Sequence, residues 1–199
     1  AFLIRDNIRH RNDILNAYLD AIDAAREEII IANAYFLPGV RFGRALYAAA
    51  QRGVRIIVLL QGKTDHQLLR YATQALYATA LQAGIRIFEY EKSFMHAKVA
   101  VIDGHWATVG SSNIDPFSLL LAKEANVVMR DDNFGGQLRS SLLAAITSGA
   151  RELPLEEQTR LPWHSRLTRW LAYGLVRAMV GIAGYGQRHW NSQDLRPKE

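Results

Sequence analysis

The segment from residue 94 to residue 115 holds residues whose types and spacing suit chemistry on a phosphodiester. It reads FMHAKVAVIDGHWATVGSSNID and follows the pattern H-x-K-x₄-D-x₆-G-S-x-N. The pattern is made by His96, Lys98, Asp103, Gly110, Ser111 and Asn113. A neutral imidazole is a nucleophile, and an ammonium two residues along a strand lies on the same face, about 7 Å away. We therefore predict that His96 attacks phosphorus while Lys98 clamps the phosphate oxygens.

The segment that follows brings two further polar residues to the same place. Gly104-His105-Trp106 predicts a short turn, and ATVGSS predicts a second strand running back beside the first. Ser111 and Asn113 then lie near His96, where their side chains can donate hydrogen bonds to anionic oxygens. By composition alone, the GSSN stretch also fits an ordinary turn.

This motif resembles the HKD signature of the phospholipase D superfamily, without a departure at any position of the signature. The similarity covers roughly residues 5–165 and extends to the second half of bacterial cardiolipin synthases. Beyond the motif it rests on Asn33-Ala34-Tyr35-Phe36-Leu37-Pro38, Arg52-Gly53-Val54, the segment 83–90 and Asn113-Ile114-Asp115. The resemblance implies a layered α/β/α domain with a mixed central sheet, and chemistry without a metal or another cofactor.

The resemblance also implies roles for single residues. His96 would form a covalent phosphohistidine, which divides phosphoryl transfer into two displacements. Asp103 belongs to the catalytic motif, where it would fix the turn between the two strands. This family carries an acidic residue downstream of its motif, so Glu124 would orient the His96 imidazole through its second nitrogen. The alternative for Glu124 is a surface carboxylate beside Lys123.

Other residues give weaker indications. Tyr35 and Phe36 follow an apolar segment, where a substrate mouth is expected, although simple packing is the alternative. The histidines outside the motif have no partners at metal-binding spacing, which argues against a metal site. The absence of cysteine excludes disulfides and thiolate ligands.

Apolar periodicity predicts helices that alternate with buried strands. Helices are expected over 12–28, 40–52, 66–82 and 133–148, and strands over 28–33, 54–60, 85–90 and 126–130, besides the two motif strands. Such alternation indicates an α/β fold whose ligands bind near the carboxyl ends of strands.

A change of composition near residue 155 divides the chain into a catalytic half-domain (1–155) and a basic, aromatic tail (156–199). From residue 160 onward the tail carries seven Lys and Arg residues against two acidic ones. Its uncharged runs are shorter than the roughly 18 residues that a transmembrane helix needs. We predict an amphipathic helix lying at a lipid surface, with Trp163, Trp170 and Tyr173 at headgroup depth. The alternative is a helix packed on the domain or on another half of the protein.

One HKD motif supplies one histidine, whereas the family mechanism uses a second one to protonate the leaving alkoxide. The sequence does not begin with methionine. We therefore expect a preceding half that carries the first motif; a homodimer with a two-fold axis is the alternative. In both cases a monomer of this chain would be inactive.

These observations favour a phosphatidyltransferase of the cardiolipin synthase type, with phosphatidylglycerol as substrate. It would be a peripheral membrane protein on the cytoplasmic face of the bacterial inner membrane. The alternative is a dimeric single-motif phosphodiesterase or nuclease, but no lysine-rich loop outside the tail suits nucleic acid. A third possibility is a non-enzymatic half-domain that serves as a partner surface.

Overall fold

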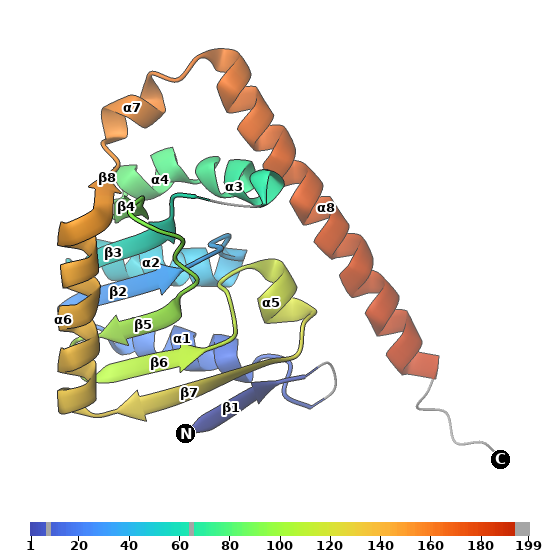
Figure 1. Cartoon of the computed structure of the whole chain (residues 1–199). Coiled ribbons are helices and arrows are strands. Elements are labelled where there is room, and N and C mark those ends of the chain that lie inside the picture. Colours follow the sequence, from blue (N-terminus) through green and yellow to red (C-terminus); the bar gives the residue numbers. More distant parts are fainter. Residues whose placement is uncertain (7–8, 64–65, 194–199) are drawn as a thin grey trace.

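A computed structural model describes residues 1–6, 9–63 and 66–193, in which a mixed sheet lies between layers of helices (Figure 1). In these ranges the eight strands follow the order β1-β7-β6-β5-β2-β3-β4-β8. The strands are β1 (Phe2–Arg5), β2 (Glu28–Asn33), β3 (Arg55–Gln61), β4 (Arg86–Tyr90), β5 (Lys98–Ile102), β6 (Trp106–Gly110), β7 (Glu124–Arg130) and β8 (Ala150–Glu152). The helices are α1 (Asp13–Ala24), α2 (Val40–Gln51), α3 (Gln67–Gln74), α4 (Tyr77–Gln82), α5 (Pro116–Leu120), α6 (Asp132–Gly149), α7 (Leu155–Thr159) and α8 (Trp163–Gln193). The predicted layered α/β/α fold with a mixed sheet is confirmed.

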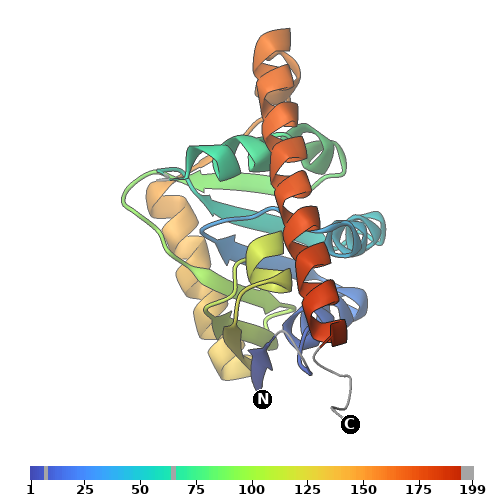
Figure 2. The ribbon, with the colours of Figure 1, turned by 90° about the vertical axis from the view of Figure 1, so that its right-hand side faces the viewer.

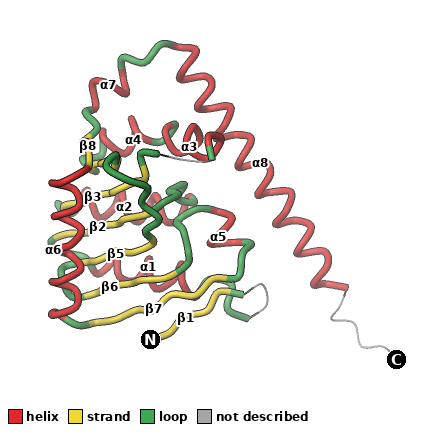
Figure 3. The backbone as a smooth tube through the Cα atoms, in the orientation of Figure 1, coloured by secondary structure: helices red, strands yellow, loops and turns green. Residues whose placement is uncertain are grey.

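The central strands are buried because both of their faces are apolar. In β2, Ile29 and Ile31 pack in one core cluster with α1 and α2, whereas Ile30 packs in another with α6. Figure 3 shows α6 on one side of the sheet and α1 and α2 on the other. β2, β3 and β4 pair in parallel, and the remaining neighbours pair antiparallel. Continuous apolar strands such as β3 are typical of a sheet covered on both faces.

The prediction of one helix over 66–82 was wrong, because the structure has two helices there. α3 ends at Gln74 and α4 begins at Tyr77. Between them the Leu76 N–H donates to the Thr73 carbonyl oxygen at 3.0 Å, which tightens the chain into a turn. The break directs the Tyr77 ring into the core, where its hydroxyl donates to Glu89 at 3.1 Å.

Several short elements have no counterpart in the sequence prediction. β1 pairs only with β7, and β8 pairs only with β4. β1 and β8 are therefore the two edge strands of the sheet in the described ranges. α5 and α7 are single turns or little more. Segments of three to five residues are too short to show a periodicity, so hydrophobic patterning cannot identify them.

The tail forms one long helix, α8, that runs across the ends of the strands and packs on α3 and α5 (Figures 1 and 2). Ala172 and Val176 are buried against Leu37 and Ala72. The opposite side of α8 is exposed and apolar; it comprises Trp163, Leu167, Trp170, Leu171, Leu175 and Met179. None of the helices in the described ranges combines the length and apolarity needed to cross a bilayer. Residues 194–199 of the predicted tail lie outside the described residues.

Asp103 fastens the turn between β5 and β6 to the start of β2. Its backbone lies in the left-handed region, with φ of 50°. Its carboxylate accepts hydrogen bonds from the backbone N–H groups of Arg26, Glu27 and Glu28, each at 2.9 Å. Burial raises the pKa of Asp103, but the three hydrogen bonds together outweigh burial, and the net effect lowers the pKa.

Asp103→Ala should destabilise the protein by about 2 kcal/mol, since it leaves three backbone donors without their acceptor and places alanine at a positive φ. Asp103→Asn retains one acceptor oxygen and tolerates the conformation, so it should lose less. Because the folded-state pKa of Asp103 is lowered, its contribution is present at neutral pH and is lost as pH falls through that pKa. Urea unfolding of the unaltered protein and both variants at pH 7 and about pH 3 measures these differences. If Asp103→Ala were as stable as the unaltered protein at pH 7, the role of the Asp103 carboxylate would be contradicted.

Candidate active site

Four strand ends meet at the edge of the sheet that faces α5 and α8 (Figure 1). This edge is the row of strand ends and is distinct from the edge strands β1 and β8. β2 ends there at Asn33 and β6 ends there at Gly110. β5 begins there at Lys98 and β7 begins there at Glu124, because both run antiparallel to those neighbours. The topology therefore gathers most of the motif at one place.

Lys98 is a buried cation at this edge. It lies opposite Asn33 in the β2–β5 register, so both side chains occupy the same face of the sheet. Lys98 is 9% exposed. Its Nζ and the Asn33 Nδ2 have no hydrogen-bond partner within the described part of the chain. Two buried donors without acceptors are costly to the fold, and they suit an anionic ligand.

Asn33 is a site residue that the sequence reasoning missed, although the signal was present. It is an amide that follows four apolar residues at the end of β2, EIIIAN, and it is fully buried. Its Oδ1 accepts from the Ile114 N–H at 3.1 Å. This bond turns the Asn33 amide nitrogen away from Ile114, so that nitrogen is the group that can donate to a ligand.

Burial lowers the pKa of Lys98, while the nearby carboxylates of Glu124 and Asp115 raise it to a smaller extent. Burial likewise raises the pKa of Asp115, although the N–H groups of Phe117 and Ser118 bond its carboxylate at the start of α5. The edge thus pairs a desolvated ammonium with carboxylates that lie near it but do not bond it.

His96 lies on the loop before β5, not on the strand as predicted. β5 begins at Lys98, although the Ala97 carbonyl oxygen still accepts from the Ala34 N–H at 2.9 Å. The His96 side chain is exposed. Its ring stacks on the Phe94 ring with 6.1 Å between the ring centroids, and it meets the Tyr35 ring edge-on with 6.4 Å between the centroids.

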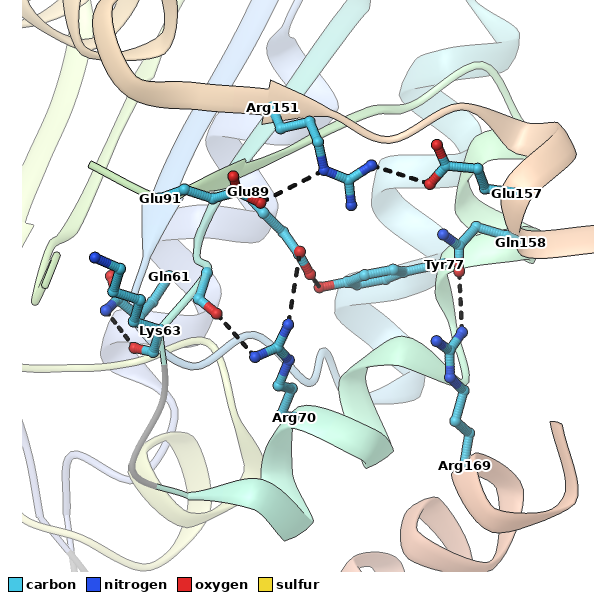
Figure 4. Close-up of polar contacts among 11 residues, drawn as sticks. Gln61, Lys63, Arg70, Tyr77, Glu89, Glu91, Arg151, Glu157, Gln158 and Arg169 are labelled. Atoms are coloured by element: carbon cyan, nitrogen blue, oxygen red, sulfur yellow. Dashed lines mark hydrogen bonds and ion pairs between the residues drawn. The ribbon is translucent and has the colours of Figure 1, made fainter. Parts of the chain in front are cut away.

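The loop of His96 is held from β3. Buried Gln61 accepts from the Met95 N–H. It also donates to the Lys63 carbonyl oxygen, as Figure 4 shows. One side chain therefore ties the loop of the proposed nucleophile to the loop that follows β3. Sequence patterning could not identify this tie, because it joins segments that lie about thirty residues apart.

Ser111 and Asn113 lie where the motif predicts, just after β6. The Ser111 Oγ donates to the Glu124 carboxylate and accepts from the Ala125 N–H at 3.1 Å. The Asn113 Oδ1 accepts from the Tyr35 N–H at 3.4 Å, so its NH₂ end is the one that can donate to a ligand.

The role predicted for Glu124 remains a prediction. Its carboxylate accepts from the Ser111 hydroxyl, and this bond, rather than one to His96, is what the structure shows. Close packing requires glycine at position 110 of the motif, because a Cβ there would overlap the Asn126 side chain and the Ala125 carbonyl oxygen.

Not every predicted site residue joins this edge. Asp103 follows β5, at the far end of the strand from Lys98, and bonds only the backbone described above. Tyr35 contacts His96, whereas Phe36 pairs with Ile114 in an isolated bridge and lines an apolar cavity. Within the described ranges, no three His, Cys, Asp or Glu residues gather as a metal site would require.

Lys98→Met should raise the melting temperature at pH 7, because it removes a desolvated charge while keeping the side-chain stem. The folded-state pKa of Lys98 lies below its unfolded value, so wild-type stability rises with pH between these two values. The advantage of the variant should therefore shrink in alkaline buffer. Calorimetry at pH 7 and about pH 10 measures this, with the exposed Lys92→Met as control. If Lys98→Met were less stable than the unaltered protein at pH 7, Lys98 would not be a destabilising buried charge.

Known proteins resemble this chain in sequence and in fold. Cardiolipin synthase B of Escherichia coli K12 is 43% identical over 188 residues, which cover 93% of this chain and 45% of that protein. The chain thus spans about half the length of the curated relatives it matches. A phospholipase D family member, Nuc, from Salmonella typhimurium shares the fold with a TM-score of 0.63 at 19% identity, over 77% of this chain and 96% of that one.

Phosphatidylserine synthase from Haemophilus influenzae Rd KW20 also shares the fold, with a TM-score of 0.70 at 12% identity, over 90% of this chain and 46% of that one. At such identities the likeness concerns the fold alone. A family model described as "Cardiolipin synthase, PLD-like domain" matches residues 18–144. The chain therefore belongs to the phospholipase D-like family, among its cardiolipin synthase-type domains.

Proposed function

We propose that the chain forms one half of a phosphatidyltransferase site of the cardiolipin synthase type. The observation that carries the proposal is the buried Lys98 ammonium, which has no partner among the described residues and lies two residues from an exposed imidazole. The 43% identity to a cardiolipin synthase supports phospholipids as substrates. A phosphatidyl group would pass through His96 to the hydroxyl of phosphatidylglycerol, yielding cardiolipin and a small alcohol.

The chemistry requires two displacements at phosphorus. In the first, a His96 nitrogen forms a bond to phosphorus while the bond to the donor's alcohol oxygen breaks and that oxygen takes a proton. In the second, the acceptor hydroxyl loses a proton and attacks phosphorus, and the bond to His96 breaks. Lys98, Asn33 and Asn113 would hold the non-bridging oxygens, on which negative charge grows.

Glu124 would serve this site in two ways. Its carboxylate fixes the Ser111 hydroxyl, and its charge favours the protonated form of Lys98. Orientation of the His96 imidazole by Glu124 remains part of the proposal, because closure around a substrate can tighten catalytic hydrogen bonds.

His96→Ala should reduce cardiolipin formation by at least about 10³-fold, because covalent catalysis is lost while the binding groups remain. The gene is expressed in a bacterium that lacks cardiolipin, and lipids are measured by mass spectrometry. His105→Ala is the matched control, since His105 lies on the far turn and bonds exposed Asp132. Near-normal cardiolipin in the His96 variant would remove this residue from the mechanism.

A second histidine must come from outside this sequence, since it holds one H-x-K motif. We propose that another half of the same protein supplies it, as the half-length match to cardiolipin synthase B suggests. A dimeric phosphodiesterase is the second candidate, because Nuc has this fold over 96% of its own chain.

The purified chain, kept monomeric by dilution, should not turn over phosphatidylglycerol, because its sequence supplies one motif histidine and not the second that would protonate the leaving oxygen. Adding a segment that carries another H-x-K motif should restore activity. Activity that rises with dimer concentration of this chain alone would favour the phosphodiesterase instead. Turnover by a strict monomer would refute the two-histidine site.

We further propose that the protein associates peripherally with the membrane, on the cytoplasmic face, through the exposed side of α8. The apolar residues there alternate with Arg166 and Arg177 along the helix, as in helices that lie at lipid headgroups. One side of α8 packs on the domain, and in this proposal the other side lies at the lipid surface. The two alternatives considered for the tail then hold for opposite sides of one helix.

Replacing Trp170, Leu171 and Leu175 by serine should weaken binding to vesicles containing phosphatidylglycerol without unfolding the domain, because these side chains are exposed. Binding by the unaltered chain should fall as salt rises, since charges are screened. Phe2→Ser, exposed on β1, is the control. Unchanged sedimentation of the triple variant with vesicles would contradict a membrane role for this side.

A further inference from the structure

Two adjoining apolar cavities lie in the domain, and α8 contributes to the walls of both. The first, of about 250 Å³, has walls from α2, α4, β3 and β4, among them Leu46, Val58, Leu76 and Ile87. The second, of about 310 Å³, has walls from α1, α2 and α5, among them Leu15, Phe42, Pro116 and Leu119. Gly39 and Val40, at the start of α2, line both. Together the cavities fall within the range of roughly 300–1,000 Å³ that is usual for ligand pockets.

Each cavity has a wall residue that is close in the sequence to a residue of the candidate active site. Phe36, in the wall of the first, follows Tyr35, whose ring contacts His96. Pro116, in the wall of the second, comes three residues after Asn113. The two segments pair beside each other, since the Leu37 N–H donates to the Ile114 carbonyl oxygen at 2.7 Å. The segments that carry Tyr35 and Asn113 therefore lie side by side where they lead into the cavity walls.

Three hydroxyl groups on the walls of the first cavity are engaged elsewhere. The Tyr47 hydroxyl donates to the Thr79 carbonyl oxygen at 2.6 Å, and the Thr73 hydroxyl donates to the Leu69 carbonyl oxygen at 2.9 Å. The Tyr77 hydroxyl points to Glu89, which Arg70 also approaches (Figure 4). These hydroxyls already have acceptors, so the cavity suits hydrocarbon better than a polar ligand.

α8 contributes wall residues to both cavities. Tyr173 lines the first, while Arg177 and Val180 line the second. Ala172 and Val176, which anchor the helix on the domain, lie next to these lining residues in the sequence. Arginines also stand in the walls, Arg44 in the first cavity and Arg41 with Arg177 in the second. Guanidinium groups beside hydrocarbon walls match the phosphates and acyl chains of lipids.

We propose that the two cavities bind the two acyl chains of the phospholipid whose phosphate is held at Lys98. This inference rests on the proposed function and deepens it, because it makes the acyl chains, and not only the headgroup, part of what the domain recognises. α8 then acts as part of the wall of a lipid-binding site as well as a surface element.

The first test uses the unaltered chain. Dihexanoylphosphatidylglycerol, below its micelle concentration, should shift the NMR methyl signals of Leu46, Val58 and Leu119, but not that of Leu142 under α6. Glycerophosphoglycerol, which has the same headgroup without acyl chains, should leave these methyl signals unchanged. Absence of shifts at the cavity methyls with the diacyl compound would overturn the proposal.

The second test fills the cavities. A side chain built at Gly43 or Gly181 meets no atom within 4 Å, and these residues line the first and the second cavity respectively. Gly43→Phe and Gly181→Phe should each weaken binding of dihexanoylphosphatidylglycerol by at least about tenfold in calorimetric titrations. Gly136→Phe, equally unobstructed on α6, is the control and should bind normally. Unchanged affinity in both cavity variants would overturn the proposal.

Two further measurements separate this inference from the proposed function. If dihexanoylphosphatidylglycerol binds as expected but the gene produces no cardiolipin, the transfer reaction fails and the acyl site stands. If cardiolipin is formed but Gly43→Phe and Gly181→Phe bind and react normally, the acyl site fails alone. Decanoate distinguishes a phospholipid from a free fatty acid: binding as tight as that of the diacyl lipid would overturn the phospholipid assignment.

Discussion

The antiparallel pairing of β5 with β2 is the constraint on which the candidate site depends. It places Lys98 opposite Asn33 and so puts two buried donors on one face of the sheet. The same pairing fixes the far end of β5, where Asp103 bonds the backbone at the start of β2. A shift of the register by one residue would turn Lys98 to the face covered by α6. The motif thus contains Lys98, a candidate site residue at the start of β5, and Asp103, which fixes the other end of β5 to the start of β2.

The buried lysine shows how the site opposes stability. Burial lowers the pKa of Lys98, which means that the folded protein disfavours the charge that phosphate binding needs. Nearby Glu124 and Asp115 reduce this cost without forming an ion pair, so the ammonium remains available to an anion. Glu124 is in turn bonded to the Ser111 hydroxyl. An anion held here would offset the desolvation penalty, so ligand binding and stability are linked through one side chain.

α8 connects the site to its surroundings. Its inner side is fixed by Ala172 and Val176, and its outer side presents apolar side chains to solvent. The helix also contributes wall residues to both apolar cavities. A lipid bound with its headgroup at the strand ends and its chains in the cavities would contact the inner side of α8, while the outer side of the same helix would face the membrane. Recognition of the phosphate, the acyl chains and the bilayer would then rest on adjoining parts of one fold.

The sequence by itself determined the motif, the alternation of helices with buried strands and the family, because these depend on local spacing and on apolar periodicity. It could not place His96 before the strand, break the helix at Leu76, or show that Asn33 lies opposite Lys98. These features arise from contacts between segments far apart in the chain: Gln61 with Met95, Tyr77 with Glu89, and β2 with β5. The two apolar cavities likewise exist only once α2, α5 and α8 have packed, since no single segment encloses them.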